Sequence, residues 1–221
     1  MSTLVSQPLY AGQRLKREEF LRRWEAMPEL KNAELIGGLV YMPSPVSRAH
    51  RSYELLLHSW LGRYVERTPG CDGGSNGTWL MLEDSPQPDA DLIILPEYGG
   101  QSCVEGAYCA GGPELATEIC VSTASYDMGP KLELYRKAGV REYLAVILGE
   151  PQVLWQRLID GRYVAIAAGD DGLLRSQVFP GLWLDPAAFL ALDRSRVMQA
   201  LDDGLKSPEH AEFVDRLRSR K

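Results

Sequence analysis

Acidic side chains in two segments of the chain have the types and spacing that could bind a divalent cation. In PQPDADLIIL, Asp89 and Asp91 lie two residues apart, so on a strand their side chains would point to the same face. In ELATEICV, Glu118 stands among apolar residues that predict a buried strand. Burying a carboxylate is unfavourable unless it is paired, protonated or bound to a cation. Two strands that bring carboxylates to one face would share this cost by holding a metal ion.

A lysine downstream of Glu118 falls in a helix that is predicted to pack on the sheet. Lys131 lies in or beside the seam that faces the sheet, because helical spacing relates it to Met128, Leu132, Tyr135 and Ala138. The lysine also falls in the predicted first turn, where the helix dipole disfavours a cation. Carboxylates on the adjoining strands would favour Lys131 in this position.

These residues also have ordinary structural interpretations. Asp89 could end a strand after a proline, Asp91 could be solvated at the end of the sheet, and Asp127 and Lys131 could form a surface pair. His50, on the apolar stripe of its predicted helix, is interpreted as a packed or hydrogen-bonded core histidine rather than a base. Their joint order, rather than any single residue, favours a site.

The elements that must position these residues follow from periodicity and turn residues. Helices are expected at residues 16–27, 47–66 and 127–139, the last with Asp127 as N-cap, Pro130 in its first turn and Gly139 at its end. A hairpin is expected at Gly37–Gly38, and strands are expected within GTWLML, DADLIIL, ELATEICV, REYLAVIL and QVLWQRL. This order predicts a mixed sheet flanked by helices, an α/β or α+β architecture.

Composition limits the class of protein. With 221 residues, 45% hydrophobic and 24% charged, residues 1–221 are expected to form one domain, with a core at about 16–188 and a helical tail at about 189–221. The formal charge of -6 argues against a general nucleic-acid coat protein but not against a nuclease, whose metal site is itself acidic. The four cysteines lack metal-site spacing. No long apolar run or signal-peptide pattern is present, so we expect a cytoplasmic protein without a membrane span.

The order of a Pro-Asp opening one strand, a glutamate in the next strand and a lysine close behind resembles the PD-(D/E)xK nuclease superfamily. From about Lys16 to about Ala188 the chain is similar to a widespread bacterial family of restriction-endonuclease-like proteins. The similarity includes AELIGGLVYM, PSPVSRAHRSYELLL, PQPDADLIIL and FPGLWLD. Its most specific part is PELATEICVSTAS followed at a fixed distance by KLELYRKAGVREYL.

The resemblance implies a restriction-endonuclease-like sheet and a Mg²⁺- or Mn²⁺-dependent endonuclease acting on DNA. It implies that Asp89 and Glu118 bind the metal, that the carbonyl of Ile119 completes the shell, and that Glu34 is an accessory acid. The superfamily lysine normally lies two residues after the glutamate, where this chain has Cys120. In this branch the lysine is relocated to the following helix, here Lys131.

Partners and rival functions follow from this interpretation. Arg48, Arg51 and the C-terminal RLRSRK are the local basic residues expected to contact DNA, and cleavage of both strands would favour a homodimer. One alternative is a catalytically inactive nucleic-acid-binding or dimerisation module that retains the fold. Another is a metal-free hydrolase using Asp89 and Glu118 as an acid/base pair, which the nearby Lys131 disfavours.

Overall fold

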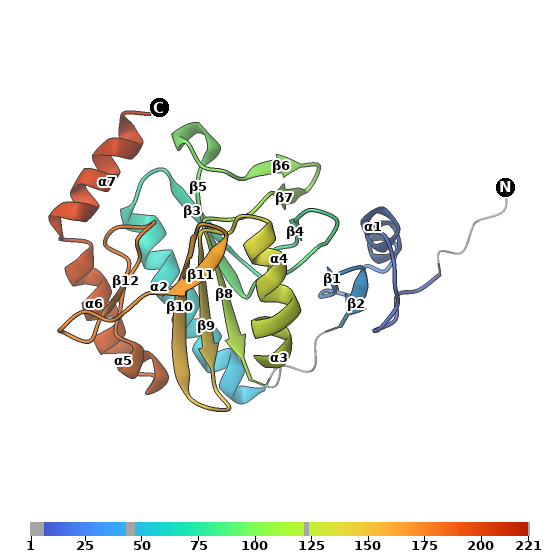
Figure 1. Ribbon diagram of the computed structural model, residues 1–221, viewed down its shortest axis with the longest axis horizontal. Coiled ribbons are helices and arrows are strands. Elements are labelled where there is room, and N and C mark those ends of the chain that lie inside the picture. The colour runs from blue at the N-terminus through green and yellow to red at the C-terminus, as the bar shows by residue number, and fades with distance from the viewer. Residues whose placement is uncertain (1–6, 43–46, 122–123, 221) are drawn as a thin grey trace.

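The computed structural model describes residues 7–42, 47–121 and 124–220. A six-stranded mixed sheet forms its centre, in the order β11-β10-β9-β8-β5-β3 (Figure 1). Strands β8 and β9 are parallel, and the other neighbours in this sheet are antiparallel. The bounds are β3 (Cys71–Ser75), β5 (Ala90–Ile94), β8 (Leu115–Cys120), β9 (Glu142–Ile147), β10 (Gln152–Ile159) and β11 (Arg162–Ala165). The predicted mixed sheet flanked by helices is confirmed.

Helices cover both faces of the sheet (Figure 1). One face carries α2 (Arg48–Arg67), α5 (Pro186–Leu190), α6 (Arg194–Gly204) and α7 (Pro208–Arg218). Its core includes Trp60, Ile119 and Trp155. The other face carries α3 (Ala124–Tyr126), α4 (Leu132–Lys137) and a small sheet of β4 (Trp79–Leu80), β6 (Cys103–Glu105) and β7 (Tyr108–Ala110). Successive residues of β8 therefore alternate between two apolar layers, which makes all six of its residues buried.

The N-terminal residues form a smaller unit with its own apolar cluster. This unit contains α1 (Arg17–Glu25), β1 (Glu34–Ile36) and β2 (Leu39–Tyr41), packed around Phe20, Leu35 and Val40. Gly37 and Gly38 both have positive φ, at 59° and 70°, as a type I′ hairpin turn requires. The predicted hairpin is thus confirmed, and its first strand carries Glu34.

The helix after Glu118 begins differently from the prediction. Asp127 does not cap it: α3 precedes Asp127, and Asp127–Lys131 form a five-residue π segment, η2. Pro130 lacks the backbone N–H that an α-helical ladder needs, and Gly129 has non-helical angles (φ -118°, ψ -106°). Asp127 and Lys131 are both buried, so the surface-pair interpretation is wrong.

Other differences concern short strands. GTWLML contributes only the two residues of β4, while β3, with the sequence CDGGS, was not predicted because glycines disfavour strands and four of its residues are exposed. The remaining short elements are η1 (Pro96–Tyr98), β12 (Leu174–Arg175) and β13 (Trp183–Leu184). Helices were correctly expected in the C-terminal tail. None of the helices in the described ranges is long and apolar enough to cross a membrane.

Candidate functional site

The site lies where β5 begins and β8 ends. The two strands are antiparallel, with Asp91 opposite Ala116 and Ala90 opposite Thr117, so one further step places Asp89 opposite Glu118. Asp89 lies just before the first residue of β5, and its Oδ2 accepts a hydrogen bond of 2.6 Å from the N–H of Ile119. The side chain of Asp89 therefore continues the pairing of the two strands beyond the backbone ladder.

Lys131 reaches this point from the end of η2. Its ammonium lies 2.8 Å from Oε1 of Glu118 and 2.8 Å from Oε1 of Glu34, and it donates to the carbonyl of Gln87 at 3.0 Å. A lysine ammonium has three N–H donors, and each of them has an acceptor here. Lys131 is only 2% exposed. The π segment and the sheet thus hold the amine in one place, beside the glutamate predicted from the sequence.

Glu118 is buried on the same face. Besides Lys131, its Oε1 accepts a hydrogen bond of 2.8 Å from the hydroxyl of Tyr135, one turn further along α4. Burial raises the pKa of Glu118 well above its ordinary value, although the charge of Lys131 opposes this shift. The tyrosine and the lysine fix the carboxyl group without compensating its burial fully.

Glu34 comes from the N-terminal unit. Its Oε1 accepts from the backbone N–H of Gln87 at 2.6 Å, and its Oε2 accepts from the hydroxyl of Tyr126 at 3.3 Å. The ring of Tyr126 packs against Tyr41 of β2, with 4.2 Å between ring centroids. These contacts join β1, β2 and α3 and bring Glu34 to Lys131.

The cluster contains more carboxyl groups than ammonium groups. Burial by itself lowers the pKa of Lys131, but the carboxylates of Glu118, Glu34, Asp127 and Asp89 outweigh it, so the lysine pKa lies above its ordinary value. Four carboxylates thus act on one ammonium. Such an arrangement favours an additional cation.

The interpretation of His50 as a packed or hydrogen-bonded core histidine is right about the hydrogen bond and wrong about the core. Its Nε2 lies 3.5 Å from Oδ2 of Asp89 and its Nδ1 lies 3.7 Å from Oε2 of Glu54, with the side chain 20% exposed. The hydrogen bond with Asp89 raises the pKa of His50, against the effect of burial. Because it lies in the first turn of α2, before the apolar stripe becomes enclosed, His50 belongs to the rim of the site.

Asp91 does not join this cluster. Its Oδ2 accepts a hydrogen bond of 3.1 Å from the indole of Trp79, and only 5% of the residue is exposed, so it is not solvated at the end of the sheet. Burial raises the pKa of Asp91 to about 6. Asp89 lies outside the strand, so the alternation of strand side chains does not place the two aspartates in one site.

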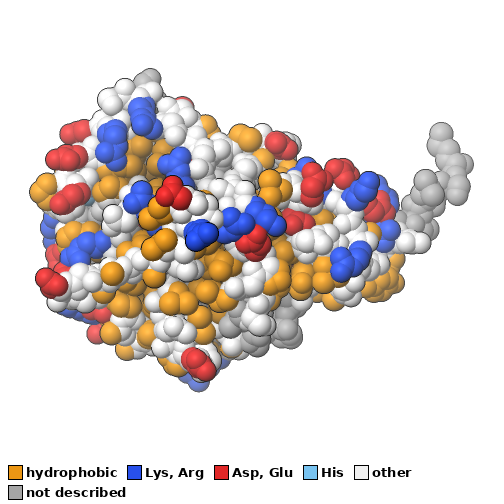
Figure 2. All heavy atoms as spheres, viewed as in Figure 1, with side chains coloured by type: hydrophobic (Ala, Val, Ile, Leu, Met, Phe, Trp, Pro, Cys, Tyr) orange, Lys and Arg blue, Asp and Glu red, His pale blue; other side chains and the backbone are white. Residues whose placement is uncertain are grey.

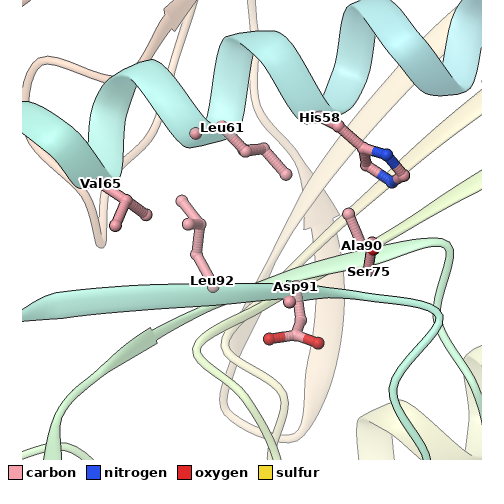
Figure 3. A pocket seen from close by; sticks show the side chains of 10 residues that line it. His58, Leu61, Val65, Ser75, Ala90, Asp91 and Leu92 are labelled. Carbon is pink, nitrogen blue, oxygen red and sulfur yellow. The ribbon is translucent and has the colours of Figure 1, made fainter.

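A separate cavity of about 240 Å³ lies between α2 and strands β3 and β5. Figure 3 shows His58, Leu61 and Val65 hanging from α2 above Leu92, while the carboxylate of Asp91 points away to the other side of the sheet. His58 lines this cavity and also contacts the site, because its Nε2 donates a hydrogen bond of 3.0 Å to the carbonyl of Asp89. This contact fixes the backbone at the start of β5.

Sequence reasoning missed several residues of the site, notably Gln87, Tyr126, Tyr135 and His58. Tyr135 follows Lys131 by one helical turn, so the apolar stripe itself contained the information that its hydroxyl could meet the carboxylate. Gln87 had no such indication, because three of its hydrogen bonds use its backbone or the backbone of distant segments.

The donor set suits a hard cation. Carboxylate and carbonyl oxygens are the ligands of Mg²⁺ and Mn²⁺, and Mg²⁺ is commonly held by one or two carboxylates while retaining waters. Asp89 and Glu118 offer two carboxylates beside the backbone of Ile119. Within residues 7–42, 47–121 and 124–220, no group of three or more acidic, cysteine or histidine side chains is arranged to hold a metal. Two carboxylates and one carbonyl would leave the other coordination positions of Mg²⁺ to water, as is usual for this ion.

The predicted basic contacts are divided between two places. Arg48 and Arg51 are exposed on the first turns of α2, next to His50. Arg220 lies beside Gly99, beyond the opposite end of β5, so the C-terminal basic segment does not face the site. On the face drawn in Figure 2, basic and acidic side chains are interspersed. The first turns of α2 are therefore the nearer basic surface.

A mixed sheet flanked by helices, with carboxylates at adjoining ends of β5 and β8, is a restriction-endonuclease-like fold. The model of the Uma2 family, described as "Putative restriction endonuclease", matches residues 17–187, and the chain belongs to this family. A crystal structure of "a putative nuclease belonging to DUF820" from Anabaena variabilis has a similar fold. Its TM-score is 0.57 at 17% identity, over 80% of this chain and 99% of that chain. The sequence matches no curated protein.

Proposed function

We propose that this protein is a Mg²⁺- or Mn²⁺-dependent endonuclease that hydrolyses phosphodiester bonds of DNA. Membership of a family described as restriction endonucleases supports the nuclease class. The observation that carries the proposal is the meeting of Asp89, Glu118 and Lys131 at the adjoining ends of β5 and β8. Metal-binding carboxylates beside a lysine suit phosphodiester hydrolysis, where negative charge must be neutralised.

Asp89, Glu118 and the carbonyl of Ile119 would hold the cation. When bound, the cation would supply neutralisation of phosphate charge and would make a water molecule more acidic. Asp89 is already oriented by the N–H of Ile119, and Glu118 is oriented by Tyr135 and Lys131. This preorganisation lets the carboxylates receive a cation without first being ordered.

Lys131 would orient the attacking water or stabilise charge on the phosphate through its ammonium. All three of its N–H groups have acceptors, so contact with substrate requires one bond to be exchanged. The bond to the neutral carbonyl of Gln87 is weaker than the two charge-assisted bonds. Before substrate binds, Glu34, Glu118 and the carbonyl of Gln87 together keep the amine in place.

The DNA backbone would approach along Arg48 and Arg51, which are exposed in the first turn of α2 with His50. Cleavage of both strands requires two sites, which a symmetric homodimer would provide. The chain would act in the cytoplasm, where its free cysteines stay reduced.

The test measures nicking and cleavage of plasmid DNA with Mg²⁺, with Mn²⁺ and with EDTA. Wild-type protein is compared with Asp89→Asn, Glu118→Gln and Lys131→Met, and Asp170→Asn serves as a control at an exposed aspartate. We expect metal-dependent cleavage that the first three substitutions abolish and the control retains. Activity that survives the carboxylate substitutions would overturn the proposal, and cleavage in EDTA would favour the metal-free hydrolase.

The main rival is an inactive module that binds nucleic acid or dimerises. The complete pairing of Lys131 and the cysteine at position 120 are the observations that favour it. This rival predicts DNA binding or self-association without hydrolysis and no stabilisation by Mn²⁺.

A further inference from the structure

Gln87 lies two residues before Asp89 and forms hydrogen bonds with several segments around the site. Its backbone N–H donates to Glu34 and its backbone carbonyl accepts from Lys131. Its side-chain Oε1 accepts from the N–H of Ala33 at 3.2 Å. Its Nε2 donates to the carbonyl of Asn76 at 3.3 Å and to the hydroxyl of Thr78 at 3.0 Å. One residue thus bonds to β1, to the β3–β4 connection and to the lysine.

We infer that Gln87 is a positioning residue that sets the place of Lys131 and attaches the N-terminal unit to the site. The inference rests on the proposed function for its catalytic consequence, but the positions that it concerns can be measured separately. Gln87 acts through its neighbours, because the hydrogen bonds of its side chain go to Ala33, Asn76 and Thr78.

The local sequence explains why a side chain is needed here. Pro86 and Pro88 flank Gln87, and neither has a backbone N–H. Within these three residues the N–H of Gln87 is therefore the available backbone donor, and Glu34 receives it. Backbone bonds hold the residues just before Gln87, between Ser85 and Leu35 and from the N–H of Trp79 to the carbonyl of Pro86, but Gln87 itself lies outside any strand ladder. The side-chain amide of Gln87 adds bonds to Ala33 on one side and to Asn76 and Thr78 on the other.

The same attachment extends to the backbone of Asp89. Asn76, which accepts from Gln87, donates its own N–H to the carbonyl of Asp89 at 3.3 Å. Asn76 has a positive φ of 52°, so its backbone is held in a conformation that side chains other than asparagine and aspartate seldom adopt. The Gln87 amide thus fixes the loop on one side of Asp89, while its carbonyl fixes the amine on the other side.

The consequence concerns the third N–H of Lys131. Two of its acceptors are carboxylates that move with β1 and β8, and the third is the carbonyl of Gln87. When the side chain of Gln87 is removed, the Pro86–Pro88 segment loses its links to Ala33, Asn76 and Thr78. The carbonyl of Gln87 then shifts, so that Lys131 and the N-terminal unit are held less firmly at the site.

The experiment uses Gln87→Leu, with Gln101→Leu as the matched control. Gln101 also uses its side-chain amide to donate to three backbone carbonyls, those of Gly112, Pro113 and Gly139, which lie away from Lys131. Each protein is treated with an amine-acetylating reagent, and the acetylation rate of Lys131 is measured by mass spectrometry. Lys137, whose side chain is 57% exposed, is the internal reference. Unfolding in urea is measured for all variants.

We expect Lys131 to be acetylated at least fivefold faster in Gln87→Leu than in wild type, relative to Lys137, and unchanged in Gln101→Leu. In the nuclease assay, Gln87→Leu should lower kcat at least tenfold with KM changed less than twofold. Gln87→Glu keeps the acceptor for Ala33 and the length of the side chain, so its kcat should lie between the kcat of wild type and that of Gln87→Leu. This variant also serves if Gln87→Leu fails to fold.

Equal acetylation of Lys131 in wild type and Gln87→Leu overturns the inference, as does an equal increase in Gln101→Leu, which would indicate general loosening. Retention of kcat in Gln87→Leu also overturns it. If the wild-type protein cleaves no DNA, the proposed function fails, and the acetylation rates still decide whether Gln87 positions Lys131.

Discussion

The ammonium of Lys131 lies 2.8 Å from a carboxylate oxygen of Glu118, and both residues are at least 97% buried. Each side chain compensates the desolvation of the other, and Glu34 adds a second carboxylate at the same distance from the amine. A buried pair of this kind is costly to break, because removal of one partner leaves an uncompensated charge.

Lys131→Met should therefore destabilise the fold by about 3–5 kcal/mol, since the carboxylates of Glu118 and Glu34 lose their counter-ion. The double variant Lys131→Met/Glu118→Gln should be less destabilised than the sum of the single variants. Urea unfolding measures both quantities. Lys137→Met removes an exposed lysine of the same helix and should cost at most about 1 kcal/mol. Similar losses at the two lysines would contradict the buried pair.

Tyr135→Phe removes the hydroxyl that donates to Glu118 at 2.8 Å. The free energy of unfolding should fall by about 1.5–3 kcal/mol, as is typical when a hydrogen bond to a charged group is removed. Tyr163→Phe is the matched control, because its hydroxyl donates to the neutral carbonyl of Val140 at 2.9 Å and should cost about 1 kcal/mol. Denaturant unfolding compares the two variants. A larger loss at Tyr163 would show that Tyr135 is not orienting a charged carboxyl group.

The sequence was sufficient to predict the elements with strong periodicity. The long helix α2, the hairpin at Gly37–Gly38 and strands β5, β8, β9 and β10 were found where expected. Burial and periodicity also singled out Glu118 and Lys131, and the family resemblance added Glu34; the structure places both glutamates 2.8 Å from the lysine ammonium. Hydrophobic period and turn chemistry are local properties, so they can be read from neighbouring residues.

The parts that could not be predicted depend on contacts between distant segments. The π segment at Asp127–Lys131 arises where a proline interrupts a helix that the sheet still holds, and no local rule gives its start. Gln87 joins residues from β1 and from the loop after β3, which the sequence separates widely. Buried carboxylates were also ambiguous, because Glu142 is fully buried and accepts four hydrogen bonds without forming an ion pair among the residues that the structure describes.

Asp91 should make stability depend on pH. Its pKa in the folded protein is raised from 3.8 to about 6 by burial, so the folded state binds the proton more tightly than the unfolded state. The contribution of protonated Asp91 to the free energy of unfolding is therefore fully present below about pH 4. It is lost as the pH rises through about 6, and the loss is about 3 kcal/mol at most.

Asp91→Asn keeps an acceptor for the indole of Trp79 but cannot ionise. The variant should be more stable than wild type at pH 7.5, by up to about 3 kcal/mol, and nearly equal to it at pH 4. Urea unfolding at the two pH values measures this difference. Asp170→Asn, at an exposed residue, should show no such pH-dependent gain. A gain at Asp91 that is the same at both pH values would mean that its ionisation is not the cause.

Substitutions of two buried glutamates, Glu118 and Glu142, should affect stabilisation by Mn²⁺ differently. At about 100 times its Kd, a bound ion stabilises the folded state by about 2.7 kcal/mol, which corresponds to a Tm increase of roughly 5–10 °C in a domain of this size. Glu118→Gln should abolish this increase. Glu142→Gln should retain it while lowering the starting Tm, because the carboxylate of Glu142 accepts from Trp155, Ser176, Gln177 and Val178, and an amide cannot accept all four bonds. Thermal unfolding with and without Mn²⁺ measures both variants. An undiminished Mn²⁺ effect in Glu118→Gln would place the ion elsewhere and leave Glu118 as only the partner of Lys131 and Tyr135.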